Sequence, residues 1–329
     1  MVKIFYEKDT DPSTLRNQLI SIIGYGSQGH AHAMNLRDSG VKVLVAEQPG
    51  TKNYDAAREA GFEVVDAATA AKRGDIIVIL VPDVIQKQIY ERDIKPNLQA
   101  GNSLMFAHGF NIHFKCIVPE SNVDVFMIAP KAPGHLVREE FARGAGTPCL
   151  VAVHQNATGQ AMKKALAYGA AIGGARAGIL ETTFKEETET DLFGEQTVLC
   201  GGSAALIKAG FDILTEAGYQ PELAYFEVMH ELKLIVDLYY RGGLSFMNYS
   251  VSDTAEYGGY TVGPKIVTEE TKTAMRAALA RIQNGEFAKE WLNEYASGGK
   301  NFQRLRDAEA AHPIEKVGAE LRKMMAWIK

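Results

Sequence analysis

The sequence predicts two domains of different class: a doubly wound α/β domain over residues 1–181 and an all-helical domain over residues 182–329. Three observations predict this. A glycine-rich turn near residue 24 lies between a short β-branched run and a helical pattern. Further apolar runs alternate with helical stretches up to about residue 153, as in a parallel sheet covered by helices. After a Gly-rich and then acidic stretch near residue 180, strand signals stop and long helical patterns begin, which places the boundary near Thr182.

The first predicted elements are a strand over 18–23 and, after the turn, a helix that ends at Gly40. In the turn, Gly24 permits a tight bend, Gly26 lets backbone N–H groups approach a pyrophosphate, and Gly29 lets the helix pack on the strand. Many turns match this spacing by chance, so the motif alone is weak evidence. The candidate cofactor-binding residues of the turn are Gly24, Tyr25, Gly26, Ser27, Gln28 and Gly29.

The second predicted strand strengthens this interpretation. It covers residues 42–46 and is followed by Glu47, close to the offset of about 20 residues that is expected of a carboxylate binding the ribose. Turn and carboxylate together predict a Rossmann-like domain that binds a dinucleotide.

Four further apolar runs predict the rest of the sheet, at residues 75–81, 103–107, 123–129 and 150–153. Ligands bind at the carboxyl ends of such strands, and Asp83, His108 and Lys131 follow three of these runs. We therefore expect Asp83, with nearby Gln86 and Gly134, to contact the cofactor, while His108 and Lys131 are candidate catalytic residues. A loop histidine bonded to backbone and a solvated lysine are the alternatives for these last two.

Two pairs of carboxylates dominate the second half. Asp191 and Glu195, and then Glu227 and Glu231, are each four residues apart, so each pair stacks on one helix face. Apolar neighbours predict that these faces turn inward, where four unpaired carboxylates would be costly to ionise. A bound cation would neutralise them, and all-oxygen ligation suits Mg²⁺ first and Mn²⁺ second.

Simpler interpretations exist for the second-half residues. Each carboxylate pair also fits a solvated helix edge with Lys185 or Lys233 as partner. Ser252 and Asp253 lie in a polar, glycine-flanked segment that could line a ligand pocket, but a serine-capped helix start explains them equally. The long amphipathic or apolar patterns predict helices buried on several sides, which favours a partner subunit; they cover residues 203–218, 221–240 and 267–283.

Composition excludes several classes of function. A net charge of -5 and a pI near 6.0, with scattered Lys and Arg, leave no basic surface for nucleic acid or an anionic membrane. Cys116, Cys149 and Cys200 form no CxxC pair, which predicts reduced, mostly buried thiols. The amino terminus lacks the layout of a signal peptide, and we expect no apolar run of membrane-spanning length. These observations predict a cytoplasmic protein with small-molecule chemistry.

Longer segments of the chain carry a further signal, namely GYGSQGHAHAMNLRDSG, LMFAHGFNIHF, PKAPGH, DLFGEQ, YFEVMHELKLIVDL and NYSVSDTAEYG. Together they resemble the ketol-acid reductoisomerase family in its short, class I form, over essentially the whole chain. The resemblance implies a Rossmann-like first domain and a knotted, all-helical second domain that interlocks with a second subunit in a homodimer, and it allows higher oligomers. It also implies an activity in branched-chain amino acid biosynthesis: Mg²⁺-dependent alkyl migration in 2-acetolactate or 2-aceto-2-hydroxybutyrate, then reduction by NAD(P)H to the 2,3-dihydroxy acid.

The resemblance also implies roles for single residues. Asp191 would bridge two Mg²⁺ ions, Glu195 would bind one of them, and Glu227 and Glu231 of the partner subunit would complete the ligand set. Ser252 would hold the substrate carboxylate. Because His108 and Lys131 match family residues near the reacting centre, they are expected to orient metal-bound water or to move a proton.

One departure from the family concerns the cofactor. Where the family has an apolar residue and then an arginine, this chain has Glu47 and Gln48, and the usual serines of the loop are Thr51 and Asn53. A 2′-phosphate ~5 Å from Glu47 would be repelled by about 3 kcal/mol per unit charge at an effective dielectric constant of ~20, before screening by salt. Lys52, Thr51 and the loop backbone can still donate to a phosphate. We therefore expect NADH to be favoured, with dual use of NADPH second.

Two other classes of function fit parts of the sequence. One is a metal-independent β-hydroxyacid or imine dehydrogenase on the same scaffold, which would need no carboxylate quartet. The other is a non-enzymatic nicotinamide-sensing protein, in which the carboxylates are structural. Sensitivity to EDTA separates the first alternative, and turnover of acetolactate with NADH and Mg²⁺ separates the second.

Overall fold

The structure, a computed structural model, describes residues 2–326 as two compact units. Unit 1 covers Met1–Thr190 and unit 2 covers Asp191–Lys329. The division falls within helix α9 (Phe184–Gly194), whereas the sequence prediction placed it near Thr182, just before this helix begins.

Unit 1 is built on a nine-stranded sheet in the order β1-β9-β8-β7-β6-β5-β2-β3-β4. The strands are β1 (Ile4–Phe5), β2 (Leu19–Ile23), β3 (Lys42–Ala46), β4 (Val64–Val65), β5 (Ile76–Ile79), β6 (Ser103–Phe106), β7 (Asp124–Pro130), β8 (Cys149–Gln155) and β9 (Ile179–Glu181). The run from β4 to β7 is parallel, which confirms the predicted α/β class.

The prediction that the whole sheet is parallel is wrong at one side. β8 pairs antiparallel with β7, and β1 pairs antiparallel with β9. The apolar run at 150–153 predicts a buried strand correctly, but hydrophobicity carries no information about strand direction. The sequence does not predict β1, β4 and β9, because two or three residues are too few to show a periodic pattern.

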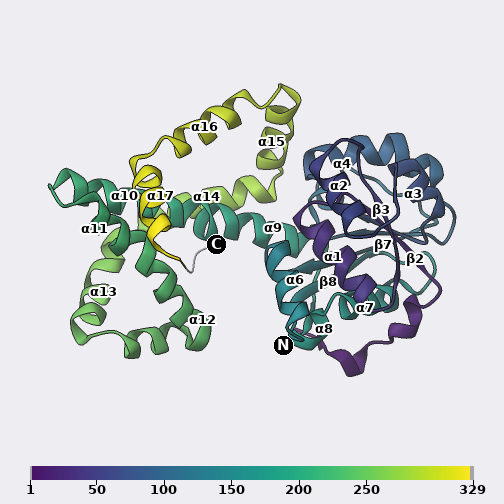
Figure 1. Cartoon of the computed structure of the whole chain (residues 1–329), viewed down its shortest axis with the longest axis horizontal. Helices are drawn as coiled ribbons and strands as arrows, with labels where there is room; N and C mark the ends of the chain where they lie inside the picture. Colours follow the sequence, from purple (N-terminus) through teal and green to yellow (C-terminus); the bar gives the residue numbers. More distant parts are fainter. Residues whose placement is uncertain (1, 327–329) are drawn as a thin grey trace. The chain divides into compact units, whose positions relative to one another are not determined.

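Helices cover both faces of this sheet, and Figure 1 shows them flanking the strands. They are α1 (Ser27–Asp38), α2 (Lys52–Glu59), α3 (Ala67–Arg73), α4 (Asp83–Ile89), α5 (Phe110–His113), α6 (Gly134–Ala142), α7 (Ala161–Ala171) and α8 (Gly174–Ala177). Each face has its own buried cluster of apolar side chains. Two separately buried faces explain why the strand sequences are almost continuously apolar.

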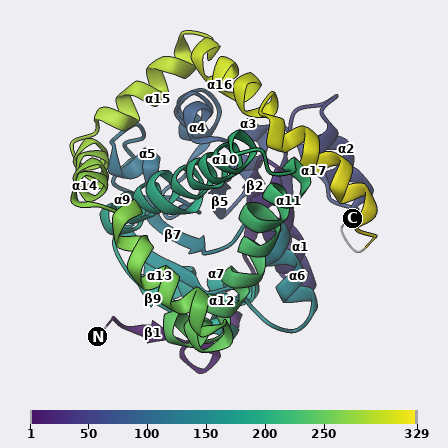
Figure 2. The same cartoon turned by 90° about the vertical axis from the view of Figure 1, so that its left-hand side faces the viewer.

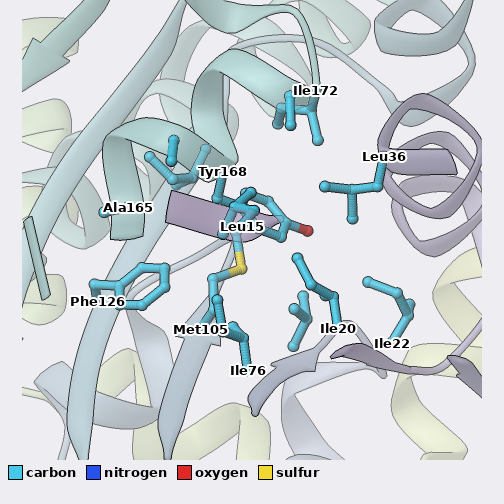
Figure 3. Close-up of a cluster of buried hydrophobic side chains, with 14 of the residues drawn as sticks. Leu15, Ile20, Ile22, Leu36, Ile76, Met105, Phe126, Ala165, Tyr168 and Ile172 are labelled. Carbon is cyan, nitrogen blue, oxygen red and sulfur yellow. The ribbon is translucent and has the colours of Figure 1, made fainter. Parts of the chain in front are cut away.

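The cluster under α1 and α7 packs both helices against the sheet, and α1 is the helix that follows the glycine turn. Figure 3 shows Tyr168 of α7 and Leu36 of α1 packed with Ile20 of β2 and Met105 of β6. All four side chains are fully buried, and each large apolar side chain of this kind stabilises the fold by about 1.5–3 kcal/mol. His32 also belongs here: burial lowers its pKa to about 3, and its ring bonds the Tyr168 hydroxyl, so its role is structural.

Unit 2 is entirely helical over the residues that the structure describes, as predicted (Figure 2). After α9 it contains α10 (Gly201–Glu216), α11 (Pro221–Tyr225), α12 (Glu231–Ser250), α13 (Asp253–Ile266), α14 (Glu269–Gln283), α15 (Glu286–Ala296), α16 (Lys300–Ala310) and α17 (Pro313–Met324). Its buried cluster is small and comes from α10, α11 and α17; it contains Phe211, Ala224, Tyr225, Ile314 and Leu321.

The prediction that these helices are buried on several sides is wrong for a single chain. Large apolar side chains are exposed along α10, α12 and α13; they include Leu206, Ile213, Tyr240, Leu244, Tyr249, Tyr257 and Tyr260. Apolar surface on this scale is typical of a face that another protein covers.

Two smaller expectations are also corrected. The continuous helical stretch Phe184–Glu216 is, by length and composition alone, long and apolar enough to cross a membrane, although no such run was expected. The three cysteines are free as predicted, but only Cys149 is buried, while Cys116 is half-buried and Cys200 is exposed.

Candidate active site

A cleft of about 770 Å³ opens in unit 1 at the carboxyl ends of β2, β3 and β5. This is the position at which doubly wound sheets bind dinucleotides. Most of the predicted cofactor residues line it, namely Gly24, Gly26, Ser27, Gln28, Glu47, Gln48, Asn53, Asp83 and Gln86, and His108 lines it too.

The glycines of the turn act as the motif predicts. Gly24 has φ +98°, and a Cβ there would lie 2.7 Å from Val81 Cγ1. A Cβ on Gly29 would lie 2.0 Å from the Gly24 carbonyl oxygen, so only glycine lets α1 start this close to β2. A Cβ on Gly26 would meet nothing within 4 Å, which leaves open space beside the amino terminus of α1 for a pyrophosphate.

Four predicted cofactor residues do not line the cleft: Tyr25, Gly29, Thr51 and Gly134. The Tyr25 side chain is buried in the core. Thr51 caps α2, because its hydroxyl accepts a hydrogen bond from the Tyr54 N–H. A Cβ on Gly134 would lie 2.2 Å from the Ser27 carbonyl oxygen, so this glycine lets α6 begin against the start of α1.

Glu47 is fixed in the cleft wall by backbone donors. Its Oε2 accepts a hydrogen bond from the Tyr25 N–H at 3.0 Å, and its Oε1 accepts one from the Gln48 N–H at 2.9 Å. The carboxylate therefore joins the glycine turn to the end of β3, where a ribose hydroxyl of a bound dinucleotide would find an acceptor.

Glu187, which the sequence patterns do not single out, contacts both candidate catalytic residues. Only 1% of its side chain is exposed, and its Oε1 lies 3.2 Å from His108 Nδ1 and 3.3 Å from Lys131 Nζ. Its Oε2 accepts a hydrogen bond from the Gly109 N–H at 2.9 Å. A side chain at Gly109 would collide with Thr188 Oγ1 at 2.3 Å, so glycine is needed for this approach.

The environment of Glu187 keeps it charged. Burial by itself raises the pKa of the carboxyl, but the hydrogen bond from His108, the charges of His108 and Lys131, and the Gly109 N–H together lower the pKa below its usual value. The two candidate catalytic residues, which come from different strand ends, are thus held by one buried carboxylate. A sequence signal for it exists, because Glu187 precedes Asp191 and Glu195 in a series with a spacing of four.

The four predicted metal ligands lie on helices, as expected, but they are not buried as predicted. Asp191 is in the last turn of α9 and is half-buried, whereas Glu195, Glu227 and Glu231 are exposed. The expectation that both pairs turn inward is therefore wrong for one chain. Among the residues described, the four carboxylates do not gather into one group of potential ligands within a chain.

The two lysines named in the simpler interpretation of the carboxylate pairs each have another carboxylate as a partner. Lys185 Nζ lies 2.9 Å from Glu189, and Lys233 Nζ lies 2.6 Å from Asp237. Each of these lysines is paired four residues away on its own helix.

Both carboxylate pairs adjoin a π-helical turn. Glu195 begins the turn Glu195–Leu199, and Glu227 lies in the turn Phe226–His230, directly before Glu231. π-Helical turns are rare in proteins overall, but those that occur often lie at functional sites. Such a turn changes the direction in which the helix points its side chains. The two side chains of each pair are therefore not stacked on one face of a regular α-helix, contrary to the prediction from their four-residue spacing.

Ser252 is exposed and caps α13, with its Oγ accepting a hydrogen bond from the Ala255 N–H at 3.2 Å. This is the simpler of the two interpretations that its sequence allows.

Comparison with protein families assigns both halves of the chain. Residues 14–178 match the family model described as acetohydroxy acid isomeroreductase, NADPH-binding domain. Residues 184–327 match the one described as ketol-acid reductoisomerase, C-terminal domain.

Comparison with solved structures gives a similar protein over the full length. An NADH-preferring ketol-acid reductoisomerase from an uncultured archaeon is 50% identical, with a TM-score of 0.96, and the match covers 98% of this chain and 99% of that one. Two more distant structures share the fold alone. A semialdehyde dehydrogenase NAD-binding protein from Cupriavidus necator is 17% identical (TM-score 0.64, covering 82% and 99%), and a pyrroline carboxylate reductase from Plasmodium falciparum is 18% identical (TM-score 0.52, covering 82% and 98%). The two family matches and the full-length similarity at 50% identity show that this chain belongs to the ketol-acid reductoisomerase family.

Proposed function

We propose that this ketol-acid reductoisomerase uses NADH in preference to NADPH. The observation that carries the proposal is Glu47, which lines the cleft after β3 and is held there by two backbone N–H groups. Gln48 follows it and supplies no positive charge. The similar archaeal structure, 50% identical, is described as NADH-preferring, which supports the proposal.

The physical reason is the charge of the adenosine 2′-phosphate. With Glu47 fixed at the ribose, a phosphate ~5 Å away is repelled by about 3 kcal/mol per unit charge at an effective dielectric constant of ~20, and salt reduces this figure. A ribose 2′-hydroxyl instead donates a hydrogen bond to the same carboxylate.

We therefore predict that kcat/KM with NADH exceeds kcat/KM with NADPH by at least about tenfold, since tenfold corresponds to only about 1.4 kcal/mol. The measurement is steady-state turnover of 2-acetolactate with each cofactor in the same low-salt buffer. The double variant Glu47→Leu, Gln48→Arg is expected to move the ratio toward NADPH by removing the repulsion and adding a bidentate donor.

A matched control is Glu63→Gln, which also removes one carboxylate from unit 1. Glu63 does not line the cleft and pairs with Arg73 at 2.6 Å. The ratio of its kcat/KM with NADH to its kcat/KM with NADPH should equal that of the wild type. A wild-type preference for NADPH would contradict the proposal.

We further propose that two Mg²⁺ ions bind Asp191 and Glu195 of one subunit together with Glu227 and Glu231 of the partner subunit. The donor set fits, because carboxylate oxygens are the ligands that Mg²⁺ prefers. Three of the four carboxylates are exposed, the two pairs do not gather within one chain, and apolar side chains are exposed on α10, α12 and α13; these observations support a shared site. When bound, such ions supply Lewis-acid polarisation of the acetohydroxy acid oxygens.

The chain's own side chains then bind, orient and move protons. His108 lines the cofactor cleft and also contacts Glu187, so it joins the cleft to this buried carboxylate. Lys131 carries a positive charge that Glu187 holds in place, which suits it to donate a proton to the oxygen that becomes an alkoxide on reduction. We propose that the Ser252 hydroxyl hydrogen-bonds to the substrate carboxylate.

The assembly that we propose is a homodimer with a knotted, interlocked helical domain, with higher oligomers built from it. The exposed apolar residues of α10, α12 and α13 support it, because a single chain leaves them in water. We propose the cytoplasm as its compartment, where the three free thiols would stay reduced.

A further inference from the structure

The cofactor cleft is strongly anionic. Among the residues that the structure describes, its lining includes four carboxylates, Glu47, Asp66, Asp83 and Asp93, and a single lysine or arginine side chain, Arg92. A site for a dinucleotide with a 2′-phosphate would be expected to offer more positive charge than this. Backbone N–H groups at the glycine turn would serve the pyrophosphate, so among the residues lining the cleft Arg92 is the cationic side chain left for any further phosphate.

Arg92 is engaged by its own neighbour. Its Nε lies 2.8 Å from Asp93 Oδ1 and its Nη2 lies 2.7 Å from Asp93 Oδ2, so one carboxylate takes up the guanidinium fork that would otherwise bind a phosphate. The Arg92 side chain is 60% exposed, and that of Asp93 is 18% exposed. The pair lies on the π-helical turn Tyr90–Ile94, which follows α4.

The pair lies at the adenosine end of the cleft. The turn Tyr90–Ile94 contacts α3, and α3 begins at Ala67, directly after Asp66 and the end of β4. β4 neighbours β3, whose end carries Glu47. Arg92 and Asp93 therefore line the cleft on the side of β3 and β4, whereas His108 lines it at the end of β6.

We propose that Asp93 is a determinant of cofactor choice, because it withholds Arg92 from an adenosine 2′-phosphate. The inference rests on the proposed preference for NADH and adds a second element to it. Glu47 repels a 2′-phosphate directly, while Asp93 neutralises Arg92, the arginine that lines the cleft. An arginine that could bind a 2′-phosphate is then present at the cleft, but Asp93 occupies its guanidinium group.

The test compares the ratio of kcat/KM for NADPH to that for NADH in a set of variants at low salt. Asp93→Asn leaves the side chain isosteric but uncharged and releases the guanidinium. The ratio is expected to rise about tenfold or more, as is typical for one charge-assisted pair with a phosphate. Raising the ionic strength should reduce this gain, because the new interaction is between partly exposed charges.

Three further variants separate release of Arg92 from a general change of charge. In Arg92→Gln, Asp93→Asn the ratio should return to within about twofold of the wild-type value. Asp93→Glu, which keeps the carboxylate, should also stay close to the wild type. The matched control is Glu63→Gln, which breaks another two-pronged arginine pair, with Arg73 at 2.6 and 3.0 Å, outside the cleft. It changes the net charge equally and should leave the ratio unchanged.

The outcomes distinguish this inference from the proposal on which it rests. If the wild-type enzyme shows no preference for NADH, the proposed cofactor use is wrong. This outcome is measured on the wild type alone and does not depend on the Asp93 variants. A preference for NADH together with no change of the ratio in Asp93→Asn overturns the role of Asp93. A gain that persists in the double variant also overturns it, since Arg92 would then not be responsible.

Discussion

Replacing Asp191 with asparagine is expected to lower the turnover of 2-acetolactate by about a thousandfold or more. An amide at this position removes the negative charge through which Asp191 would bridge two divalent ions, and the loss of several kcal/mol of transition-state stabilisation gives a factor of this size. Binding of NADH should stay within about threefold of the wild-type value, because the residues that line the cleft all belong to unit 1 and Asp191 is not among them. The measurements are turnover at saturating Mg²⁺ and NADH affinity by fluorescence.

Glu186→Gln is the matched control for this variant. Glu186 lies on the same helix, α9, but its side chain is exposed and accepts a hydrogen bond from the Thr182 hydroxyl. The control loses the same charge and should keep wild-type turnover. If Asp191→Asn also kept wild-type turnover, the assignment of Asp191 to a metal site would be wrong.

The second large effect is expected at Glu187. In Glu187→Gln a neutral amide replaces the carboxylate that faces His108 and Lys131. The NH2 group of this amide must face either Lys131 or the Gly109 N–H, neither of which can accept a hydrogen bond from it. Loss of charge-assisted hydrogen bonds in a buried site predicts a fall in kcat of about 10- to 100-fold. KM for NADH should change by less than about threefold, because Glu187 does not line the cofactor cleft.

The assay must be run where Glu187 is ionised, and the direction of its pKa shift gives the range. Since the pKa in the fold is lowered from the ordinary value of 4.5, the carboxylate is charged at neutral pH. Its contribution to the free energy of unfolding is complete above pH 4.5 and is lost as the pH falls through the lowered value. Glu187→Gln should therefore destabilise the protein at pH 7 more than at pH 4. A normal kcat at pH 7 would show that Glu187 does not position the two side chains.

The parts of the fold that the sequence predicts well depend on local patterns. The strand before Gly24, the turn and α1 follow from β-branched residues and glycine spacing, and Gly26 has the open space beside it that the motif predicts. Glu47 is found by its distance in sequence from the turn, and the structure adds that the Tyr25 N–H holds it. In both cases the residues that decide the structure are close in the chain.

The parts that the sequence does not predict depend on contacts between distant segments. Glu187 is 79 residues from His108 and 56 from Lys131, and neither spacing carries a signal. The exposure of Glu195, Glu227 and Glu231 was missed for a different reason, because apolar neighbours indicate burial without showing whether the same chain or another one provides it. The engagement of Arg92 by Asp93 needed side-chain geometry, since adjacent opposite charges are common on protein surfaces.

The most direct test of the shared active site mixes two inactive chains. Asp191→Asn and Glu231→Gln chains are unfolded together, refolded and assayed with acetolactate, Mg²⁺ and NADH, and exchange of subunits is confirmed with differently tagged chains. In a shared-site dimer, a mixed pair has one site with both lesions and one intact site. Because about half of randomly paired dimers are mixed, activity should return to roughly a quarter of the wild-type value. If each site is built within one chain, every site keeps a lesion, so confirmed exchange without recovery of activity would contradict the shared site.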